Sequence, residues 1–388
     1  MKRALLLLLA IALVATPAPV NAQDRLPRKF LFAGIGVGIG LGITAAYSAG
    51  NFSKNIGWCT SPECVGIVSS VGFGFVGYLV GREVDQHYAL RYRAAPPISL
   101  QGNTRALRTR ATTLALDRSL LAAHGDDGVE LVAALPALAY LGHRGQGLRD
   151  VTGTAVDDTR QRLLLGTTTG LYLYTLSGDA PGTRVLSGET AAVAPRGERV
   201  AVATATALRI GTVAGDSVSW RADSTTAADR ITALRWQRDD LLWVLTESAL
   251  WAYGVSADDS VTMLGRVDLR GSLRRLAVRD TLAAIAAGSE GVYLVDIRTP
   301  AAPREIAQWS EPRYVYDVAL WRDALAVAAG PEGLYLLAPV GAGLEPLGLD
   351  REAGFVSSLA ATWEALYALD RNHGIVRRLE FPVSAAGR

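Results

Sequence analysis

A pattern of apolar strands recurs along most of the chain, and it constrains the fold more than any other feature. The clearest copies are residues 273–297 and 315–340. Each of these two reads as an apolar strand, a short polar turn, a second apolar strand, a glycine-containing turn and a third strand. Seven copies begin near Thr112, Thr152, Thr190, Ile231, Leu273, Val315 and Val356, at intervals of 38 to 42 residues. Short strands repeated at this period are typical of β-propeller blades.

The repeat therefore predicts an all-β fold, a seven-bladed β-propeller of four-stranded blades over residues 98–388. The apolar second strands fit strands that are buried on both faces between neighbouring blades. The fourth strand is the least distinct, as in residues 303–309. Residues 98–108 precede the first full copy, and we expect them to pair with the last blade, which would close the ring and remove its exposed edge.

The residues at the hairpin turns and the tryptophans are predicted to serve the fold. Asp127-Gly128, Glu290-Gly291 and Glu332-Gly333 supply the positive φ that tight turns need, so their acidic residues are interpreted as turn formers. A further set lies within strand patterns and is predicted to pack between blades: Trp236, Trp243, Trp251, Trp321 and Trp363.

One copy carries a likeness to a known family. The segment YLVDIRTPAAPREIAQW, Tyr293 to Trp309, joins an apolar pair and Val-Asp to the next strand through a proline-containing link. It resembles the LVIVD-repeat propellers of bacterial and archaeal exported proteins, although the sixth copy, YLLAPV, lacks the acidic ending. The resemblance implies a propeller fold and an exported location, without a catalytic signature. The GH and WD marks of WD40 repeats are absent.

The first 22 residues are predicted to be a signal peptide. Lys2 and Arg3 are followed by 13 mostly apolar residues, Ala4 to Thr16, and by the small-residue cleavage site Val20-Asn21-Ala22. Thirteen residues are too few to cross a bilayer. The mature chain is therefore expected to be exported to the periplasm or the outer envelope.

Residues 23–97 are predicted to form an apolar, glycine-rich hairpin and a charged connector. Phe30 to Gly50 and Val65 to Gly81 contain no charged residue. Small residues lie four apart: Gly34, Gly38, Gly42 and Ala46, then Gly66, Ser70 and Gly74. This spacing favours two closely packed helices, as in glycine-zipper hairpins, although the alternating glycines also allow strands. Residues 30–81 are thus expected to associate with a membrane or to form a homo-oligomer.

The only two cysteines, Cys59 and Cys64, lie in the loop of this hairpin. In an oxidising compartment such a pair predicts a disulfide. Two thiolates alone make a poor zinc site, and the spacing is not that of a CxxC redox pair.

The charge balance argues against nucleic acid as a partner. Without Lys2 and Arg3 the chain has 37 basic and 37 acidic residues, so it offers no general attraction to polyanions.

No catalytic constellation is found, so we predict a protein that is not an enzyme and has no cofactor or metal. The chain lacks GxSxG, HExxH and paired cysteine–histidine motifs. His124 with Asp126 and Asp127 could hold a metal, but one solvated loop is the favoured interpretation.

If the propeller has a site, its geometry places it at the axial mouth, where the links into the inner strands converge. Arginine and tyrosine are enriched in recognition surfaces, although charged loop residues at strand entrances would give the same pattern. The candidates are Arg149, Asp150, Arg230, Arg274, Arg275, Arg313, Tyr316 and Asp317.

These observations together predict a non-enzymatic binding or scaffold protein of the cell envelope. Its propeller would be displayed outside the cytoplasm, tethered by the hairpin, and would bind a protein or a glycan. The alternative is an exported hydrolase or lyase that uses the axial mouth.

Overall fold

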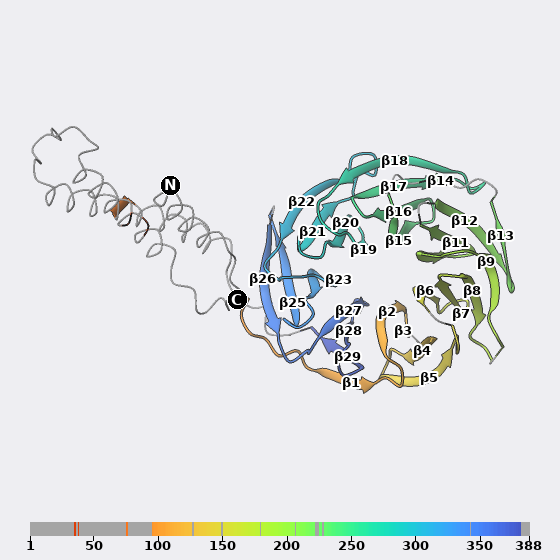
Figure 1. The fold of residues 1–388 in the computed structure, drawn as a ribbon, viewed down its shortest axis with the longest axis horizontal. Helices are drawn as coiled ribbons and strands as arrows, with labels where there is room; N and C mark the ends of the chain where they lie inside the picture. Colours follow the sequence, from red (N-terminus) through yellow and green to blue (C-terminus); the bar gives the residue numbers. More distant parts are fainter. Residues whose placement is uncertain are drawn as a thin grey trace, which may run out of the picture. The chain divides into compact units, whose positions relative to one another are not determined.

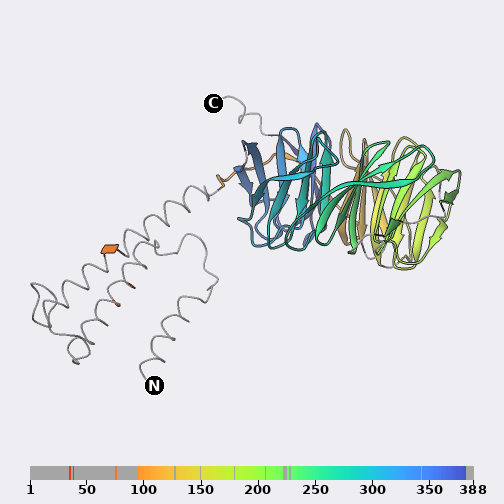
Figure 2. The same cartoon turned by 90° about the horizontal axis from the view of Figure 1, so that it is seen from above.

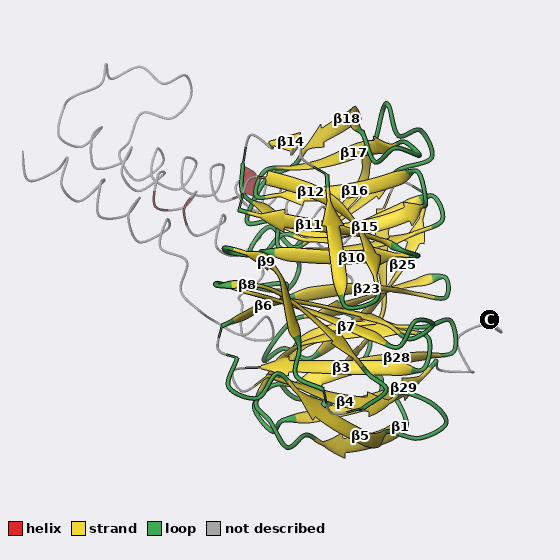
Figure 3. Ribbon diagram, turned by 90° about the vertical axis from the view of Figure 1, so that its right-hand side faces the viewer, coloured by secondary structure: helices red, strands yellow, loops and turns green. Residues whose placement is uncertain are grey.

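The computed structural model describes residues 95–381 apart from 126–127, 149, 179, 206, 222–224, 227–228 and 342, together with Ile35, Gly38, Phe75 and Val76. Residues 95–381 belong to one of two compact units, Ala94–Arg388. In this unit seven antiparallel sheets stand radially around a central axis (Figure 1). Seen edge-on, the strands run between two faces, where the loops gather (Figures 2 and 3). The predicted seven-bladed propeller is confirmed.

Each blade has four strands, which follow one another from the axis outward. Blade 1 contains β2 (Ala111–Asp117), β3 (Leu120–Gly125), β4 (Gly128–Ala133) and β5 (Ala139–Arg144). Blade 2 contains β6 (Val151–Asp157), β7 (Arg162–Thr167), β8 (Gly170–Thr175) and β9 (Thr183–Ser187). Blade 3 contains β10 (Ala192–Arg196), β11 (Arg199–Thr204), β12 (Ala207–Ala214) and β13 (Ser217–Trp220), and the short β14 (Thr225–Thr226) also pairs with β12.

The remaining blades follow the same order. Blade 4 contains β15 (Ile231–Arg238), β16 (Leu241–Thr246), β17 (Ala249–Val255) and β18 (Val261–Asp268). Blade 5 contains β19 (Arg275–Arg279), β20 (Leu282–Ala286), β21 (Val292–Asp296) and β22 (Arg304–Trp309). Blade 6 contains β23 (Asp317–Trp321), β24 (Ala324–Ala328), β25 (Leu334–Val340) and β26 (Gly343–Asp350). The inner strands begin within two residues of the predicted starts.

Blade 7 closes the ring with strands from both ends of the propeller. It contains β27 (Val356–Ala361), β28 (Ala365–Asp370), β29 (Ile375–Glu380) and β1 (Gly102–Ala106). The outermost strand, β1, runs antiparallel to β29, with Gly102 opposite Leu379 and Ala106 opposite Ile375. The predicted pairing with the last blade is confirmed for residues 102–106, whereas Ile98 donates its backbone N–H to the Leu349 carbonyl of blade 6.

The core is divided among the spaces between blades, because no blade can cover its own apolar faces. Trp243 and Ile285 pack between blades 4 and 5, and Trp321 and Leu366 pack between blades 6 and 7. A similar cluster of buried side chains fills each of the other five spaces between neighbouring blades. Burying one such large apolar side chain contributes about 1.5–3 kcal/mol, so the blade interfaces carry the hydrophobic stabilisation of the ring.

The turn glycines adopt the predicted conformation. Gly128, Gly291 and Gly333 have φ of 103°, 87° and 103°. The side chain of Glu332 accepts hydrogen bonds from the Arg313 backbone N–H at 2.9 Å and from the Tyr335 hydroxyl at 3.2 Å. This acidic turn residue therefore holds the loop that enters blade 6.

Four of the five tryptophans pack as predicted, and one does not. Trp243 and Trp321 are fully buried, and Trp236 and Trp251 lie partly buried against the cluster between blades 3 and 4. Trp363 is 61% exposed, so its predicted packing is wrong. It occupies the turn between β27 and β28, where the apolar pattern of the repeat continues across a change of chain direction.

Little of the segment before residue 95 belongs to the described residues. Ile35, Gly38, Phe75 and Val76 are helical. The predicted signal peptide, most of the predicted hairpin and the Cys59–Cys64 disulfide lie outside the described residues and stay predictions. Within the described part of the chain, no helix has the length and apolar character needed to cross a bilayer.

Candidate functional site

The inner strands of all seven blades line a central channel with a volume of about 810 Å³. The channel walls are mostly the inner strands themselves, so the side chain at each inner-strand position decides what the channel presents. The lining includes charged and hydroxyl side chains as well as alanines.

One inner-strand position sets blade 4 apart from the others. Aligning the blades by the pairing of their first two strands places Arg235 of β15 opposite Trp243. The equivalent residues in the other blades are all alanine: Ala115, Ala155, Ala194, Ala277, Ala319 and Ala360. All seven of these residues line the channel. A long cationic side chain therefore stands in the channel where the repeat otherwise has a methyl group.

A second arginine reaches into the same channel from blade 5. Arg275 donates from Nη2 to the Thr113 hydroxyl of β2 at 2.9 Å, which links blade 5 to blade 1. Arg235 donates from Nη1 to the backbone carbonyl of Leu234 at 3.0 Å. Among the described residues, neither guanidinium has a carboxylate within ion-pair distance.

The charges in the channel affect one another. Enclosure by the protein lowers the pKa of Arg235; Asp317 opposes this effect and Arg275 adds to it. Burial and the neighbouring Arg275 lower the pKa of His124 to about 3. His124 is therefore a neutral ring at physiological pH, and its Nδ1 shares a hydrogen bond of 2.6 Å with the Thr154 hydroxyl.

Asp317 lines the channel, but its oxygens serve the packing of the blades. Oδ2 accepts hydrogen bonds from the Ser358 hydroxyl at 2.7 Å and from the Leu359 N–H at 2.9 Å, both in blade 7. Oδ1 accepts from the Val318 N–H at 2.9 Å. The Ser358 hydroxyl in turn accepts from the Leu114 N–H of blade 1 at 3.0 Å. Asp317 thus links the inner strands of blades 6 and 7, and through Ser358 the link continues to blade 1.

Two arginines near the inner hairpin turns of the channel have carboxylate partners. Arg162 contacts Asp157 at 2.7 Å, and Arg196 contacts Asp239 at 2.7 Å. The Arg235 and Arg275 pair differs from them in having none among the described residues.

On the face where the chain enters the inner strands, blades 5 to 7 carry a row of ring contacts. The Arg274 guanidinium lies 6.0 Å from the Tyr314 ring centroid. The Tyr314 and Tyr316 rings are 4.8 Å apart, and those of Tyr316 and Phe355 are 5.3 Å apart. We call Arg274, Tyr314, Tyr316 and Phe355 the aromatic row. The three rings are half-buried, so each keeps an accessible edge or face.

Two glycine turns pack against the rings of the aromatic row. Gly288 and Gly330 have φ of 61° and 57°. A Cβ at Gly288 would lie 3.1 Å from the Tyr314 ring, and one at Gly330 would overlap the Tyr316 ring. The glycines therefore let both rings lie directly against the turns.

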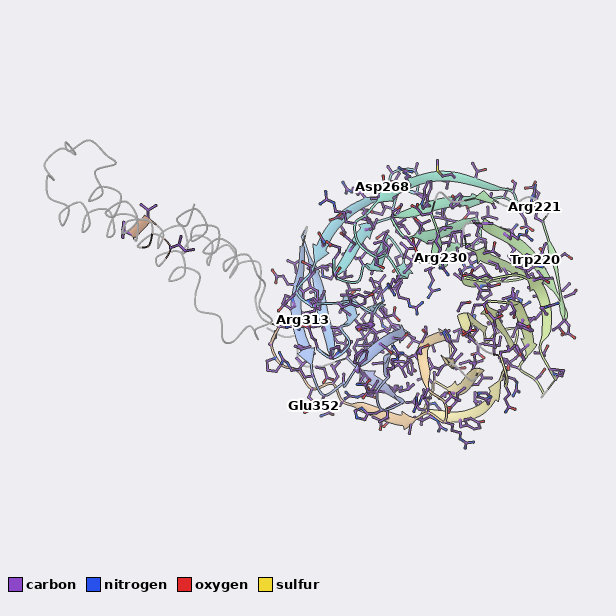
Figure 4. The ribbon with its side chains drawn as sticks, in the orientation of Figure 1. Trp220, Arg221, Arg230, Asp268, Arg313 and Glu352 are labelled. Atoms are coloured by element: carbon purple, nitrogen blue, oxygen red, sulfur yellow. The ribbon has the colours of Figure 1, made fainter. Side chains whose placement is uncertain are left out.

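The structure brings only some of the predicted axial residues together. Arg275 and Asp317 line the channel, and Arg274 and Tyr316 belong to the aromatic row. Of the other candidates, Arg230 also lies beside the central opening (Figure 4), and the rest lie elsewhere on the propeller or outside the described residues.

Arg230 lies beside the central opening and contacts Glu189 at 2.6 Å, whereas Arg313 lies over blade 6, away from the opening (Figure 4). Asp150 is exposed, with φ of 56°. Arg149 lies outside the described residues.

The prediction that His124 lies in a solvated loop is wrong. His124 is in β3 and is only 4% exposed, because strand β3 continues further than its polar ending suggests. Asp126 and Asp127 lie outside the described residues, and the described residues contain no group of three side chains that could hold a metal.

Arg235, Tyr314 and Phe355 were not predicted as site residues. Arg235 could have been found by aligning the seven copies, since it alone departs from alanine at its position. Tyr314 and Phe355 each precede an inner strand by a few residues of the repeat, a position whose significance only the ring contacts reveal.

The fold and the channel define the class of this protein as a seven-bladed β-propeller. No family model matches the chain, and no curated protein sequence matches it. The LVIVD resemblance therefore stays a prediction.

Solved structures share the fold at low sequence identity. The structure of U3-55K is 14% identical with a TM-score of 0.59, covering 74% of this chain and 100% of that chain. The WD40 repeats of RRP9 are 14% identical with a TM-score of 0.59, covering 74% of this chain and 99% of that chain. The WD40 β-propeller domain of Doa1 is 14% identical with a TM-score of 0.54, covering 75% of this chain and 98% of that chain. At this identity the likeness establishes the fold alone.

Proposed function

We propose that this chain is a non-enzymatic binding scaffold of the cell envelope, whose propeller presents the aromatic row to a protein partner. The row is the observation that carries the proposal. Tyrosine and arginine dominate the energetics of many protein interfaces, because they bury large areas while keeping a polar group at their tips.

The aromatic row is held in place before any partner binds. Tyr316 packs between Tyr314 and Phe355 and lies on the turn at Gly330. The loop that carries Tyr314 is fixed through the hydrogen bond from the Arg313 N–H to Glu332. Side chains that are already ordered lose less conformational entropy on association, which favours binding.

A protein partner is favoured over a glycan by this composition and by the fold. A chain of the same fold, 10% identical with a TM-score of 0.59, occurs in the structure of the mitotic checkpoint complex. The alternative of an exported hydrolase or lyase finds no support in Asp317, because its oxygens already accept hydrogen bonds from Ser358, Leu359 and Val318.

The location in the envelope rests on the sequence of the first 97 residues. The predicted signal peptide, residues 1–22, supports export, and the glycine-rich residues 30–81 support a tether. Fractionation of cells that produce the full chain tests this part, since recovery of the protein only in the cytoplasm would contradict it.

The protein-binding role is tested by capture with the tagged full chain. We expect Tyr316→Ala and Arg274→Ala to abolish capture of a partner that the unchanged chain retains from envelope extract. Tyr140→Ala is the matched control, because Tyr140 also lies under an arginine, with the Arg108 guanidinium 4.0 Å from its ring, but outside the row. Melting curves of each variant confirm the fold. Retention of every captured protein by both row variants would contradict the proposal.

A further inference from the structure

We infer that the central channel holds a second binding site, separate from the aromatic row, in which Arg235 and Arg275 bind a small anion through a carboxylate or phosphate group.

The first observation is that the fold does not need an arginine at residue 235. Six blades place alanine at the equivalent position, and each of these blades forms the same inner strand. The Arg235 side chain stands in the channel, where it donates to the carbonyl of its neighbour Leu234. A long side chain at a position that the fold fills with a methyl group is best explained by something that it binds.

The second observation is the imbalance of charge around the two guanidiniums. Arg235 is exposed within the channel and Arg275 is half-buried, so both guanidiniums are open to a small ligand. Arg162 and Arg196, which also lie near the channel, have aspartate partners at 2.7 Å. Arg235 and Arg275 have no such partner among the described residues, and the nearby Asp317 is occupied by blade 7. A bound anion would supply the missing charge.

The other groups around the two arginines suit an anion as well. The Thr113 hydroxyl lies at the Arg275 guanidinium, and the Thr154 hydroxyl contacts His124. His124 is neutral, since burial and Arg275 keep its pKa low, so it adds no charge of its own and the two arginines supply the positive charge of the site. A volume of about 810 Å³ is in the range of sites for small molecules.

The shared chemistry of the ligand is a group with two or more oxygens that carry negative charge. The planar guanidinium donates two parallel N–H···O hydrogen bonds to such a group, whether it is a carboxylate or a phosphate. The experiment therefore includes one probe of each kind.

Isothermal titration calorimetry of the purified full chain with inorganic phosphate, and separately with citrate, tests the inference. We expect at least one of the two anions to bind, and Arg235→Ala to weaken that binding about tenfold or more, because charge-assisted hydrogen bonds are lost. Arg235→Ala should fold normally, since alanine is the residue of the other six blades. Arg235→Lys keeps the charge but loses the paired donors, so its affinity for the anion should lie between those of the unchanged chain and Arg235→Ala.

Arg371→Ala is the matched control, because it removes one positive charge from an exposed turn outside the channel. It should leave the affinity unchanged. Phosphate or citrate should also raise the melting temperature of the unchanged chain and of Arg371→Ala, but not that of Arg235→Ala. The inference is overturned if neither anion binds, or if Arg235→Ala and Arg371→Ala bind with equal affinity.

Discussion

Replacing Asp317 by alanine tests whether hydrogen bonds between inner strands hold the blades in register. In the folded protein its Oδ2 accepts from the Ser358 hydroxyl and the Leu359 N–H, at 2.7 and 2.9 Å, and all three residues are buried. Alanine would leave both donors of blade 7 without this acceptor. A buried polar group that loses its partner costs about 1–3 kcal/mol, so the two together cost about 2–6 kcal/mol.

We expect a loss near the middle of this range, about 3 to 4 kcal/mol in the free energy of unfolding. The Ser358 hydroxyl still accepts from the Leu114 N–H, which limits the loss. Removal of the carboxylate also withdraws the negative charge that favours the charged form of Arg235, and this adds to the loss in the free energy of unfolding. Asp317→Asn keeps one acceptor oxygen of the same shape and should lose less than Asp317→Ala.

Urea unfolding followed by circular dichroism and by tryptophan fluorescence measures these free energies. Asp323→Ala is the matched control, because Asp323 lies in the same blade but is exposed in the turn after β23. The reasoning is refuted if Asp317→Ala and Asp323→Ala change the free energy of unfolding by the same small amount, below about 0.5 kcal/mol.

Two further predictions concern a turn and a buried ring. Gly333→Ala should lower the free energy of unfolding by about 1–3 kcal/mol, because φ is 103° and a Cβ would overlap the Asp350 carbonyl; Gly341→Ala, with φ of 59° and no atom within 4 Å of the new Cβ, should cost less in the same urea titration. His124 has a folded pKa of about 3 against 6.5 for the free side chain, so between these values the unfolded state binds more protons than the folded state. The free energy of unfolding therefore decreases as the pH is lowered from 6.5 towards 3. Between pH 6 and pH 4 the unchanged chain should therefore lose up to about 1.4 kcal/mol more per pH unit than His124→Gln, and parallel pH profiles would contradict this.

The sequence predicts the scaffold because the scaffold is periodic. Each copy repeats similar strand starts, and five of the seven repeat the turn glycine, so an ambiguous copy can be interpreted from the others. Even β1 could be assigned, since a ring with one incomplete blade needs a strand from outside the repeat. The exposed Trp363 was missed because an apolar residue in a turn looks like one more residue of a strand.

The site was harder to predict because its residues are not close in the sequence. Arg275 and Thr113 meet across the channel from blades 5 and 1, and nothing in either copy announces the contact. Asp317 was predicted as a binding residue from its place at a strand entrance. Its contacts with Ser358 and Leu359 follow from the geometry of neighbouring blades, which the linear pattern does not contain. Whether these residues bind a ligand stays a prediction.

The pairing of β1 with β29 has a consequence for how the molecule is made. A nascent chain emerges with its N-terminal side first, so β1 must wait for almost 270 residues before its partner strand exists. Until then the apolar walls of the first and last blades face open water, and the unfinished arc is exposed to proteases and to self-association. Any truncation before Ile375 would remove β29, so β1 would have no strand to pair with and the ring could not close.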